Sequence, residues 1–554
     1  MPAVDSDVYK NISKLFDSEG NPLVPSAYSM EAFVLINSDG NERDITKLVT
    51  SFNIIEELFS PVLICNINIR DDENLFEEHG LSGQEKLKIK VAVAPYPGAG
   101  AEEKMLSLEF FVKEYPNFRK TIDALNVQEY SMVAISSFAY ISQLTRISKA
   151  IPSPAGNSQG NPILEIKEIF EENLLFAPSI LGSITNFADV IIANLKEAVN
   201  FIKGLFGLSS KKIEKKQKIQ NALSSYNERL IGRMPNFVYI DTTYEPVAKF
   251  KGNITLRSPL AAIEFLRTKA YDENLTPFFV YNRIGQGIGD ADVGDTVVIQ
   301  SLTSIMEGDI YYAGGTDRPY NYTAGFVNKA GNPGDPAFYE EMKRRILSVN
   351  ANLKINKLQQ ASSGVFGNSL QIYDYTAKDY ISKRYDPYAE GVASANSKGI
   401  ISQLRPAENR PFVGMKYGSD ISGEGIIDLG EEGAISQHII SELHLPPVQC
   451  AQDEINGFYT APEIYANVLN KVKYYYSRLR DDQNIELEVY GDFQLNPGVK
   501  IELSFPKAKE LSSEDEAEEE DTIISGLYLI TIAIHDFTEG LYKSKLKCVK
   551  LTQD

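Results

Sequence analysis

Two-residue alternation of apolar and polar side chains, present near both ends of the chain, limits the possible folds more than any other feature. In the run 85–94, leucine, isoleucine and valine occupy every second position, and lysines fill most of the positions between them. The runs 485–490 and 499–505 repeat this pattern near the other end. A period of two is typical of a β-strand that buries one face. The sequence therefore predicts a β-domain at each end.

The two β-rich ends also share the same order of parts. Near the start, 62–69 leads to the strand 86–94, and then prolines and a loop precede a closing hairpin. Near the other end, 485–490 leads to the strand 498–505, and then a proline and an acidic loop precede the hairpin 527–551. Such repetition is hard to obtain by accident. We therefore expect a duplicated β-barrel domain that flanks a middle insertion, and three such chains would present six equivalent units in a closed ring.

The middle of the chain has a different character. A linker rich in Ser, Gly, Asn and Pro at 152–162 precedes helical segments, Ser258 and Pro259 supply an N-cap and a first helical turn, and a capping box at 460–463 begins another helix. The fold class expected is α+β, mostly β, with two tube-like β-barrel domains flanking a mixed α/β middle region with a helical insertion. The expected domains are an N-terminal extension (1–28), a first tube-like β-barrel (29–150), a linker and helical insertion (151–256), a mixed α+β middle domain (257–459), and a helix plus second tube-like β-barrel (460–554) with an acidic loop (507–521).

Charge and cysteine usage limit the function classes. The 554 residues carry a formal net charge of -20, which argues against wrapping nucleic acid, because phosphate neutralisation needs clustered Lys and Arg. An acidic surface either keeps the protein soluble or lets DNA pass without adhering. The three cysteines lack CxxC spacing, and Cys65 and Cys548 are expected in the core. The most apolar stretch, 174–208, is broken by charges, so we expect no membrane span.

The motifs that carry chemistry are weak. The glycine-rich loop 285–295 contains three aspartates, but it lacks both the GxGxxG spacing before a helix and the twelve-residue calcium pattern, so a turn is expected. None of the four histidines has a metal-ligand spacing, and His535 is expected on the polar side of its strand. We therefore expect no enzyme activity, no catalytic residues, no cofactor and no metal. A carboxylate pair for glycan hydrolysis stays open, because Asp and Glu number 75.

A dense acidic loop precedes the last hairpin. Such a run is usually a solvated insertion, and the functional alternative is that it docks a basic partner or lines a channel entrance. Its candidate interaction residues are Glu514, Asp515, Glu516, Glu518, Glu519, Glu520 and Asp521.

One segment resembles a known family. The run 491–501 contains a small polar turn, Asn496, Pro497 and Gly498, that introduces a strand. It closely resembles the C-terminal motif of the central baseplate hub protein of T-even-like contractile-tailed bacteriophages, the tube-domain hub family. The resemblance covers about half of the chain. The upstream runs that resemble phage hub sequences are 54–70, 87–94, 110–146, 257–263 and 276–279.

The resemblance implies a structural virion protein of the tail baseplate, assembled in the host bacterial cytoplasm. It implies a homotrimer that adapts the sixfold tail tube to the threefold central spike protein. The other implied partners are the tail tube or tube-initiator proteins and the tape-measure protein, and DNA would pass through the lumen without specific binding. The segments 152–234 and 321–429 depart from the family, because they exceed its compact form.

Two alternative functions stay open. The first is the hub of a related contractile injection system, which the sequence hardly separates from a phage tail. The second belongs to another class, a tail-associated cell-wall glycan hydrolase, which would need a carboxylate pair in a cleft.

Overall fold

The fold is given by a computed structural model of the whole chain. It describes residues 26–37, 39–93, 104–120, 127–152, 158–174, 237–247, 249–250, 252–285, 292–293, 295–313, 317–322, 341–350, 368–374, 379–385, 439–444, 462–481, 484–507, 520–521 and 523–551.

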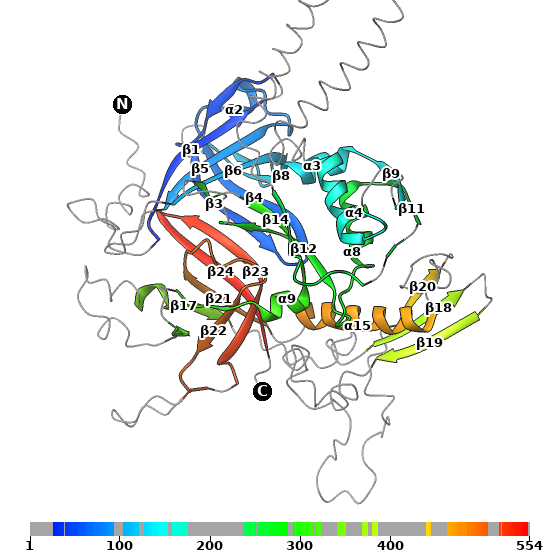
Figure 1. Cartoon of the computed structure of the whole chain (residues 1–554). Coiled ribbons are helices and arrows are strands. Elements are labelled where there is room, and N and C mark those ends of the chain that lie inside the picture. The colour runs from blue at the N-terminus through cyan, green and yellow to red at the C-terminus, as the bar shows by residue number, and fades with distance from the viewer. Residues whose placement is uncertain are drawn as a thin grey trace, which may run out of the picture.

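The N-terminal part forms an antiparallel sheet around one apolar core (Figure 1). Phe33, Phe52 and Phe110 come from three different strands and meet in this core, because alternate side chains of each strand point to the same face. The pairing order is β3–β4–β8–β6–β5–β1–β2. The elements are β1 (Tyr28–Ile36), β2 (Glu42–Asp44), β3 (Val49–Glu57), β4 (Ser60–Asp71), α2 (Leu75–Glu78), β5 (Lys86–Val93), β6 (Lys104–Glu114), β7 (Arg119–Lys120) and β8 (Gln128–Ser136).

The C-terminal part forms a second β-rich unit with its own core. Ile501, Leu503 and Leu546 are buried there, on the apolar positions of the alternating runs. Three short segments from the middle of the chain add strands to this unit, because β15 and β16 pair with β22, and β17 pairs with β21. The elements are α15 (Pro462–Asp481), β21 (Asn484–Tyr490), β22 (Lys500–Ser504), β23 (Gly526–Thr538), β24 (Leu541–Lys550), β15 (Ile310–Tyr311), β16 (Tyr320–Asn321) and β17 (Ile346–Asn350).

The two β-rich units are joined edge to edge into one sixteen-stranded sheet. β23 is long enough to serve both, because its first half pairs with β22 and its second half, 532–538, pairs antiparallel with residues 51–57 of β3. Figure 1 shows the C-terminal hairpin of β23 and β24, in red, meeting the blue N-terminal strands.

The strand pairings close into two hydrogen-bonded circuits that share the β23–β24 hairpin. In the first, Ala27 bridges to Leu541, so the start of β1 meets the start of β24, and the pairs continue through β5, β6, β8, β4 and β3 to β23. In the second, β24 pairs with β21, β21 with β17, and a bridge between Asn321 and Arg345 links the start of β17 to β16. β16 then pairs with β22, which returns to β23.

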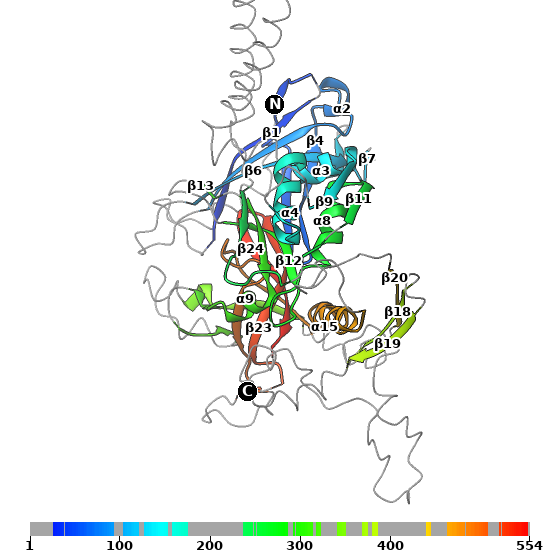
Figure 2. The same ribbon diagram turned by 45° about the vertical axis from the view of Figure 1, so that its right-hand side comes forward.

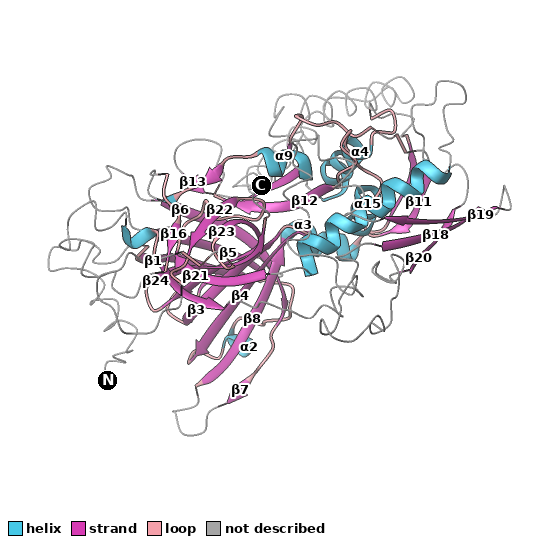
Figure 3. Cartoon of the chain, turned by 90° about the horizontal axis from the view of Figure 1, so that it is seen from below, coloured by secondary structure: helices cyan, strands magenta, loops and turns pink. Residues whose placement is uncertain are grey.

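The middle of the chain packs beside this sheet as a mixed layer. Three strands in the order β10–β14–β12 face the helices α3, α4 and α8 across a core that includes Ile166, Ile263 and Val280 (Figure 1). Figure 3 shows α3, α4 and β12 of this layer from below. Ser258 accepts a hydrogen bond from the Ala261 N–H, which confirms the predicted N-cap. The elements are α3 (Ser137–Leu144), β9 (Ile147–Ile151), α4 (Pro162–Ile169), the π-helical turn η1 (Phe170–Leu174), β10 (Phe237–Ile240), β11 (Gly252–Arg257), α8 (Pro259–Arg267), β12 (Phe278–Ile284), β13 (Asp292–Val293), β14 (Asp295–Ser301) and α9 (Leu302–Glu307).

A separate three-stranded sheet of β18 (Asn368–Asp374), β19 (Asp379–Tyr385) and β20 (Ile439–His444) lies beside α15. The expectation of a mostly β fold is confirmed, since a large antiparallel sheet dominates the described residues. The predicted burial of Cys65 and Cys548 is also confirmed. Most of the predicted helical insertion, 175–236, and most of the loops in 323–438 lie outside the described residues.

Candidate assembly interface

The motif turn that the sequence singled out is a buried junction. The Asn496 side chain donates a hydrogen bond of 2.8 Å to the Phe493 carbonyl, and the Gly498 N–H donates to the Ile530 carbonyl of β23. Gly498 has a φ of +83°, which favours glycine, and an added Cβ would lie 2.9 Å from the Tyr281 hydroxyl of β12. The turn of Asn496, Pro497 and Gly498 therefore connects the C-terminal unit to the middle layer, and its role in the fold is packing.

A buried polar cluster lies where β3, β23 and β24 meet. Nε2 of His535 is 3.6 Å from Oε1 of Glu56, and Nδ1 of His535 is 2.6 Å from the Tyr542 hydroxyl. The Ile284 N–H, at the end of β12, donates to the same Glu56 oxygen at 2.6 Å. Burial raises the pKa of the Glu56 carboxyl, against the opposing effects of His535 and Arg283. Figure 2 shows β12 beside the hairpin that carries this cluster.

The expected position of His535 on the polar side of its strand is wrong. His535 has no exposed surface, and it alternates with the outward-facing Ile534 and Asp536. Apolar residues occupy both faces of β23, and a bulge between Ile530 and Ile532 shifts the register, so the alternation does not reveal which face His535 joins.

The opposite face of the same strands carries polar side chains in both units, with isoleucines such as Ile55 and Ile534 between them. We call it the polar face, and it comprises the outward side chains of β21, β24, β23, β3, β4 and β8. Its N-terminal half carries the charged Glu57, Arg70 and Glu129 at the strand ends. Between them lies a ladder of uncharged groups, in which Asn66 donates to Asn53, Asn68 donates to Ser51, and Ser131 donates to Asn68 at 2.9 to 3.0 Å. The polar residues of this face include Ser51, Asn53, Asn66, Asn68, Ser131, Glu486, Glu488, Asp536, Lys543, Lys545 and Lys547.

The C-terminal half of the polar face carries charges in opposed pairs. Lys543 Nζ lies 2.6 Å from Glu488, and Lys545 Nζ lies 2.6 Å from Asp536. The hydrogen bond from Lys545 to Asp536 raises the pKa of that lysine above its ordinary value. Register places Asp536 opposite Asn53 of β3, so the ion pairs of the C-terminal half meet the ladder of the N-terminal half at this point.

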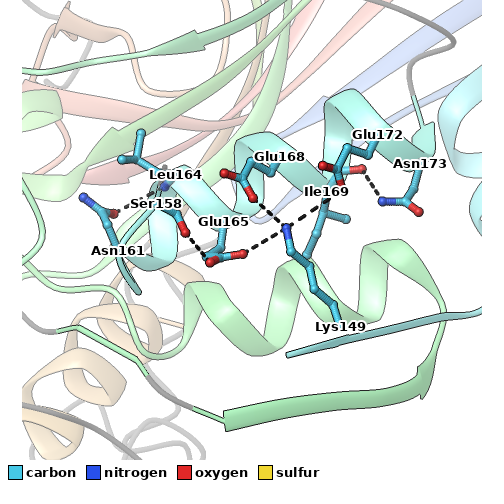
Figure 4. A network of polar contacts seen from close by, with 9 residues as sticks. All are labelled: Lys149, Ser158, Asn161, Leu164, Glu165, Glu168, Ile169, Glu172 and Asn173. Carbon is cyan, nitrogen blue, oxygen red and sulfur yellow. Dashed lines mark hydrogen bonds and ion pairs between the residues drawn. The ribbon is translucent and has the colours of Figure 1, made fainter. Parts of the chain in front are cut away.

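A second polar cluster ties β9 to α4 (Figure 4). Lys149 Nζ lies 3.0 Å from the fully buried Glu165 and 2.7 Å from Glu168, while Glu172 is at 4.0 Å. Burial alone would lower the pKa of Lys149, but the hydrogen bonds to Glu168 and Glu165 outweigh burial and raise it. Ser158 donates to Glu165 from the turn before the helix. Lys149 of β9 thus forms ion pairs with three carboxylates, and these contacts hold α4 and η1 against the strand.

The described ranges contain no candidate metal centre. Within them, no three His, Cys, Asp or Glu side chains are grouped so that they could hold a metal ion. Of the aspartates in the glycine-rich loop, Asp292 and Asp295 begin β13 and β14, while Asp290 lies outside the described residues. Among the helices that the structure describes, none is both long and apolar enough to cross a bilayer.

The structure describes only the two ends of the acidic loop, Lys507 and the pair Glu520 and Asp521. Asp521 donates its N–H to the Phe505 carbonyl at 2.8 Å, and Glu520 bridges to Pro506, so the two ends of the loop lie together at the end of β22. The other candidate residues, Glu514, Asp515, Glu516, Glu518 and Glu519, lie outside the described residues.

Comparison with known proteins gives structural neighbours only. No family model matches the chain, and no curated protein matches it. A 43 kDa tail protein of prophage MuSo2 from Shewanella oneidensis is 10% identical, with 94% of this chain and 98% of that chain covered and a TM-score of 0.37. A tail protein from Neisseria meningitidis is 9% identical, with 95% and 97% covered and a TM-score of 0.38.

A component of the Escherichia coli type VI secretion system, whose description notes structural similarity to bacteriophage T4 tail proteins, is 7% identical. The alignment covers 95% of this chain and 77% of that chain, with a TM-score of 0.34. The solved structures to which this chain is similar are thus tail and baseplate proteins of phages and components of a secretion system related to them.

Proposed function

We propose that this chain is the structural hub of a contractile-tail baseplate, a homotrimeric ring that adapts a sixfold tail tube to a threefold central spike. The observation that carries the proposal is the pairing of residues 532–538 with 51–57, which joins two β-rich units edge to edge. Through that pairing, two units far apart in sequence present polar side chains on one shared face of the sheet. A chain with two such units supplies six of them when three copies close into a ring.

The two hydrogen-bonded circuits support two tube-like barrels per chain. Each circuit returns to its starting strand through hydrogen-bonded strand pairs, and the shared hairpin fixes the spacing between the two circuits. A closed circuit leaves few free edges, which favours an orderly ring over uncontrolled strand addition.

The composition of the polar face supports a channel wall for DNA. Asn53, Asn66 and Asn68 offer hydrogen-bonding groups without charge, and the lysines of β24 lie beside carboxylates. Double-stranded DNA is bound mainly by Lys and Arg that neutralise its phosphates, so a face without net positive charge has little affinity for it. The lumen would hold the end of the tape-measure protein before DNA passes.

The proposed setting follows from this role. The partners are the central spike, the tail tube or tube-initiator proteins, and the tape-measure protein, and the site is the tail baseplate of a virion assembled in the host cytoplasm. The hub of a related contractile injection system would have the same architecture. We propose that the role is structural and not enzymatic.

The proposal is tested by native mass spectrometry and electron microscopy of the purified full-length chain, alone and with its spike. The expected species is a trimer, and the expected image is a ring with threefold symmetry that has six similar lobes on one side. A stable monomer that clears peptidoglycan in a zymogram would overturn the hub and favour the glycan hydrolase.

A further inference from the structure

Strand β24 presents a row of lysines on the polar face. Lys543, Lys545 and Lys547 occupy every second position, so all three point to the same side of the sheet. The Lys545 side chain is 47% exposed and that of Lys543 is 36% exposed. A row of three cations on one strand would, by itself, be a binding surface for the phosphates of a DNA backbone.

Carboxylates from both neighbouring strands oppose these lysines. Glu488 of β21 contacts Lys543, and Asp536 of β23 contacts Lys545, both at 2.6 Å. Register places Glu486 directly opposite Lys547. The Glu488 and Asp536 side chains are only 19% and 17% exposed, so these carboxylates are more buried than the lysines they contact. Three lysines and three carboxylates leave this part of the face without net charge.

We propose that Glu488 and Asp536 mask the β24 lysines from DNA phosphates, so that a duplex in contact with this face slides and is not retained. The inference rests on the proposed function, because it places the polar face in the lumen of the ring. A phosphate reaches Lys543 or Lys545 only by displacing a carboxylate already within hydrogen-bond distance, and that exchange yields little net energy.

Masking explains an otherwise contradictory composition. A wall of carboxylates alone would repel a passing polyanion, and a wall of free lysines would hold it. Alternating the two gives a surface that is locally neutral, and the nearby ladder of Ser51, Asn68 and Ser131 adds uncharged hydrogen-bonding groups to the same face. The ligand class that this face fits is the phosphate backbone of double-stranded DNA in transit.

The test frees the lysines and asks whether DNA is then retained. The double variant Glu488→Gln and Asp536→Asn keeps side-chain size and removes two negative charges from the face. We expect it to bind a short linear duplex about ten-fold more tightly than the wild type. The slope of log K against log salt should steepen by about 0.9 for each phosphate that a freed lysine contacts. Fluorescence anisotropy across a salt series measures both quantities.

Two matched variants separate masking from a general loss of negative charge. Glu42→Gln with Glu73→Gln removes two carboxylates from ion pairs with Lys88 and Arg43, at positions outside the polar face, and should leave DNA affinity unchanged. Adding Lys545→Gln to the Glu488 and Asp536 variant should reverse most of the gain. A gain of equal size in the control variant, or no gain in a variant whose thermal unfolding matches the wild type, would overturn the inference.

The shape of the DNA probe separates this inference from the trimer. A linear duplex can thread a closed ring, whereas covalently closed circular DNA cannot, so the double variant should retain the linear form only. Equal retention of both forms would overturn the placement of the lysines in the lumen. Native mass spectrometry of the same samples reports the trimer independently, so a failed ring and failed masking give different results.

Discussion

The carboxyl of Glu56 and the imidazole of His535 face each other at 3.6 Å in the interior, and neither side chain has any exposed surface. Glu56 belongs to β3 of the N-terminal unit and His535 to the shared hairpin, so the contact lies across the seam between the two units. The Ile284 N–H brings the middle layer to the same carboxylate. Three parts of the chain therefore converge on one acid.

The first prediction concerns the pH dependence of this seam. Because the folded-state pKa of Glu56 is raised above 4.5, the folded protein binds more protons than the unfolded chain between 4.5 and that higher value. The resulting stability is fully present below pH 4.5 and is lost as pH rises through the folded pKa. Glu56→Gln cannot titrate, so its free energy of unfolding relative to wild type should rise with pH and then level off.

Urea unfolding at a series of pH values measures this difference. Glu57→Gln serves as the reference, because Glu57 lies on the opposite side of β3, across from Ile532. A Glu56→Gln curve that stays parallel to the wild-type curve through the acidic range would contradict the role of burial.

The second prediction concerns the close approach of Gly491 to Tyr542. A Cβ at position 491 would lie 2.2 Å from the tyrosine ring, and this ring packs between Phe493 and Phe537 in the core. Gly491→Ala should therefore lower the free energy of unfolding by about 3 kcal/mol, because the added methyl group overpacks the core and forces the packed ring to shift. Gly308→Ala is the control, because its nearest contact would be 3.3 Å away. Equal melting temperatures for the two variants would refute the close packing.

The third prediction concerns the cluster around Lys149. Lys149→Met removes the cation shared by Glu165, Glu168 and Glu172, of which Glu165 is fully buried, and should cost about 3 kcal/mol of stability. Lys167→Met is the matched control. It breaks only the exposed pair with Glu171 at 3.7 Å and should change stability by less than about 0.5 kcal/mol. Chemical unfolding compares them, and similar losses would mean that the buried carboxylate does not depend on Lys149.

The fourth prediction concerns the acidic loop. Residues 509–518 can be deleted and the ends rejoined by a short turn, because Asp521 and Phe505 are already hydrogen-bonded. The free energy of unfolding should change by no more than about 1 kcal/mol, because the entropic cost of closing a loop depends only weakly on the number of residues in it. Asp521→Ala should be the more damaging change, because it removes the acceptor of the Ile523 N–H. Insoluble protein after the deletion would show that the loop packs.

Local patterns were sufficient for the individual elements. The alternation at 85–94 corresponds to β5 and that at 485–490 to β21, and α15 begins at Pro462, within the predicted capping box 460–463, whose first two residues lie outside the described residues. These predictions succeed because period and capping depend only on neighbours in the sequence. The domain boundaries and the roles of the acidic residues stay predictions.

Long-range pairing was beyond the reach of those patterns. No local sequence pattern indicates that Ser51 pairs with Thr538, or that Ala27 bridges to Leu541. Which distant strands pair depends on how the complete chain packs. The seam of Glu56 and His535 was missed for the same reason, and the masked lysines of β24 became visible only when register placed the carboxylates beside them.

The shared hairpin has a consequence for the order of events during synthesis. The Ser26 hydroxyl donates to the Gly491 carbonyl, 465 positions later, and the first circuit closes only through β23 and β24. A ribosome that has made the chain as far as Ser136, the end of β8, has therefore produced a sheet with an open side, and this side closes only after the hairpin is made. Contacts of such separation slow folding. A prematurely terminated chain would lack the closing strands, so in the ring that we propose the connectivity itself would exclude incomplete copies.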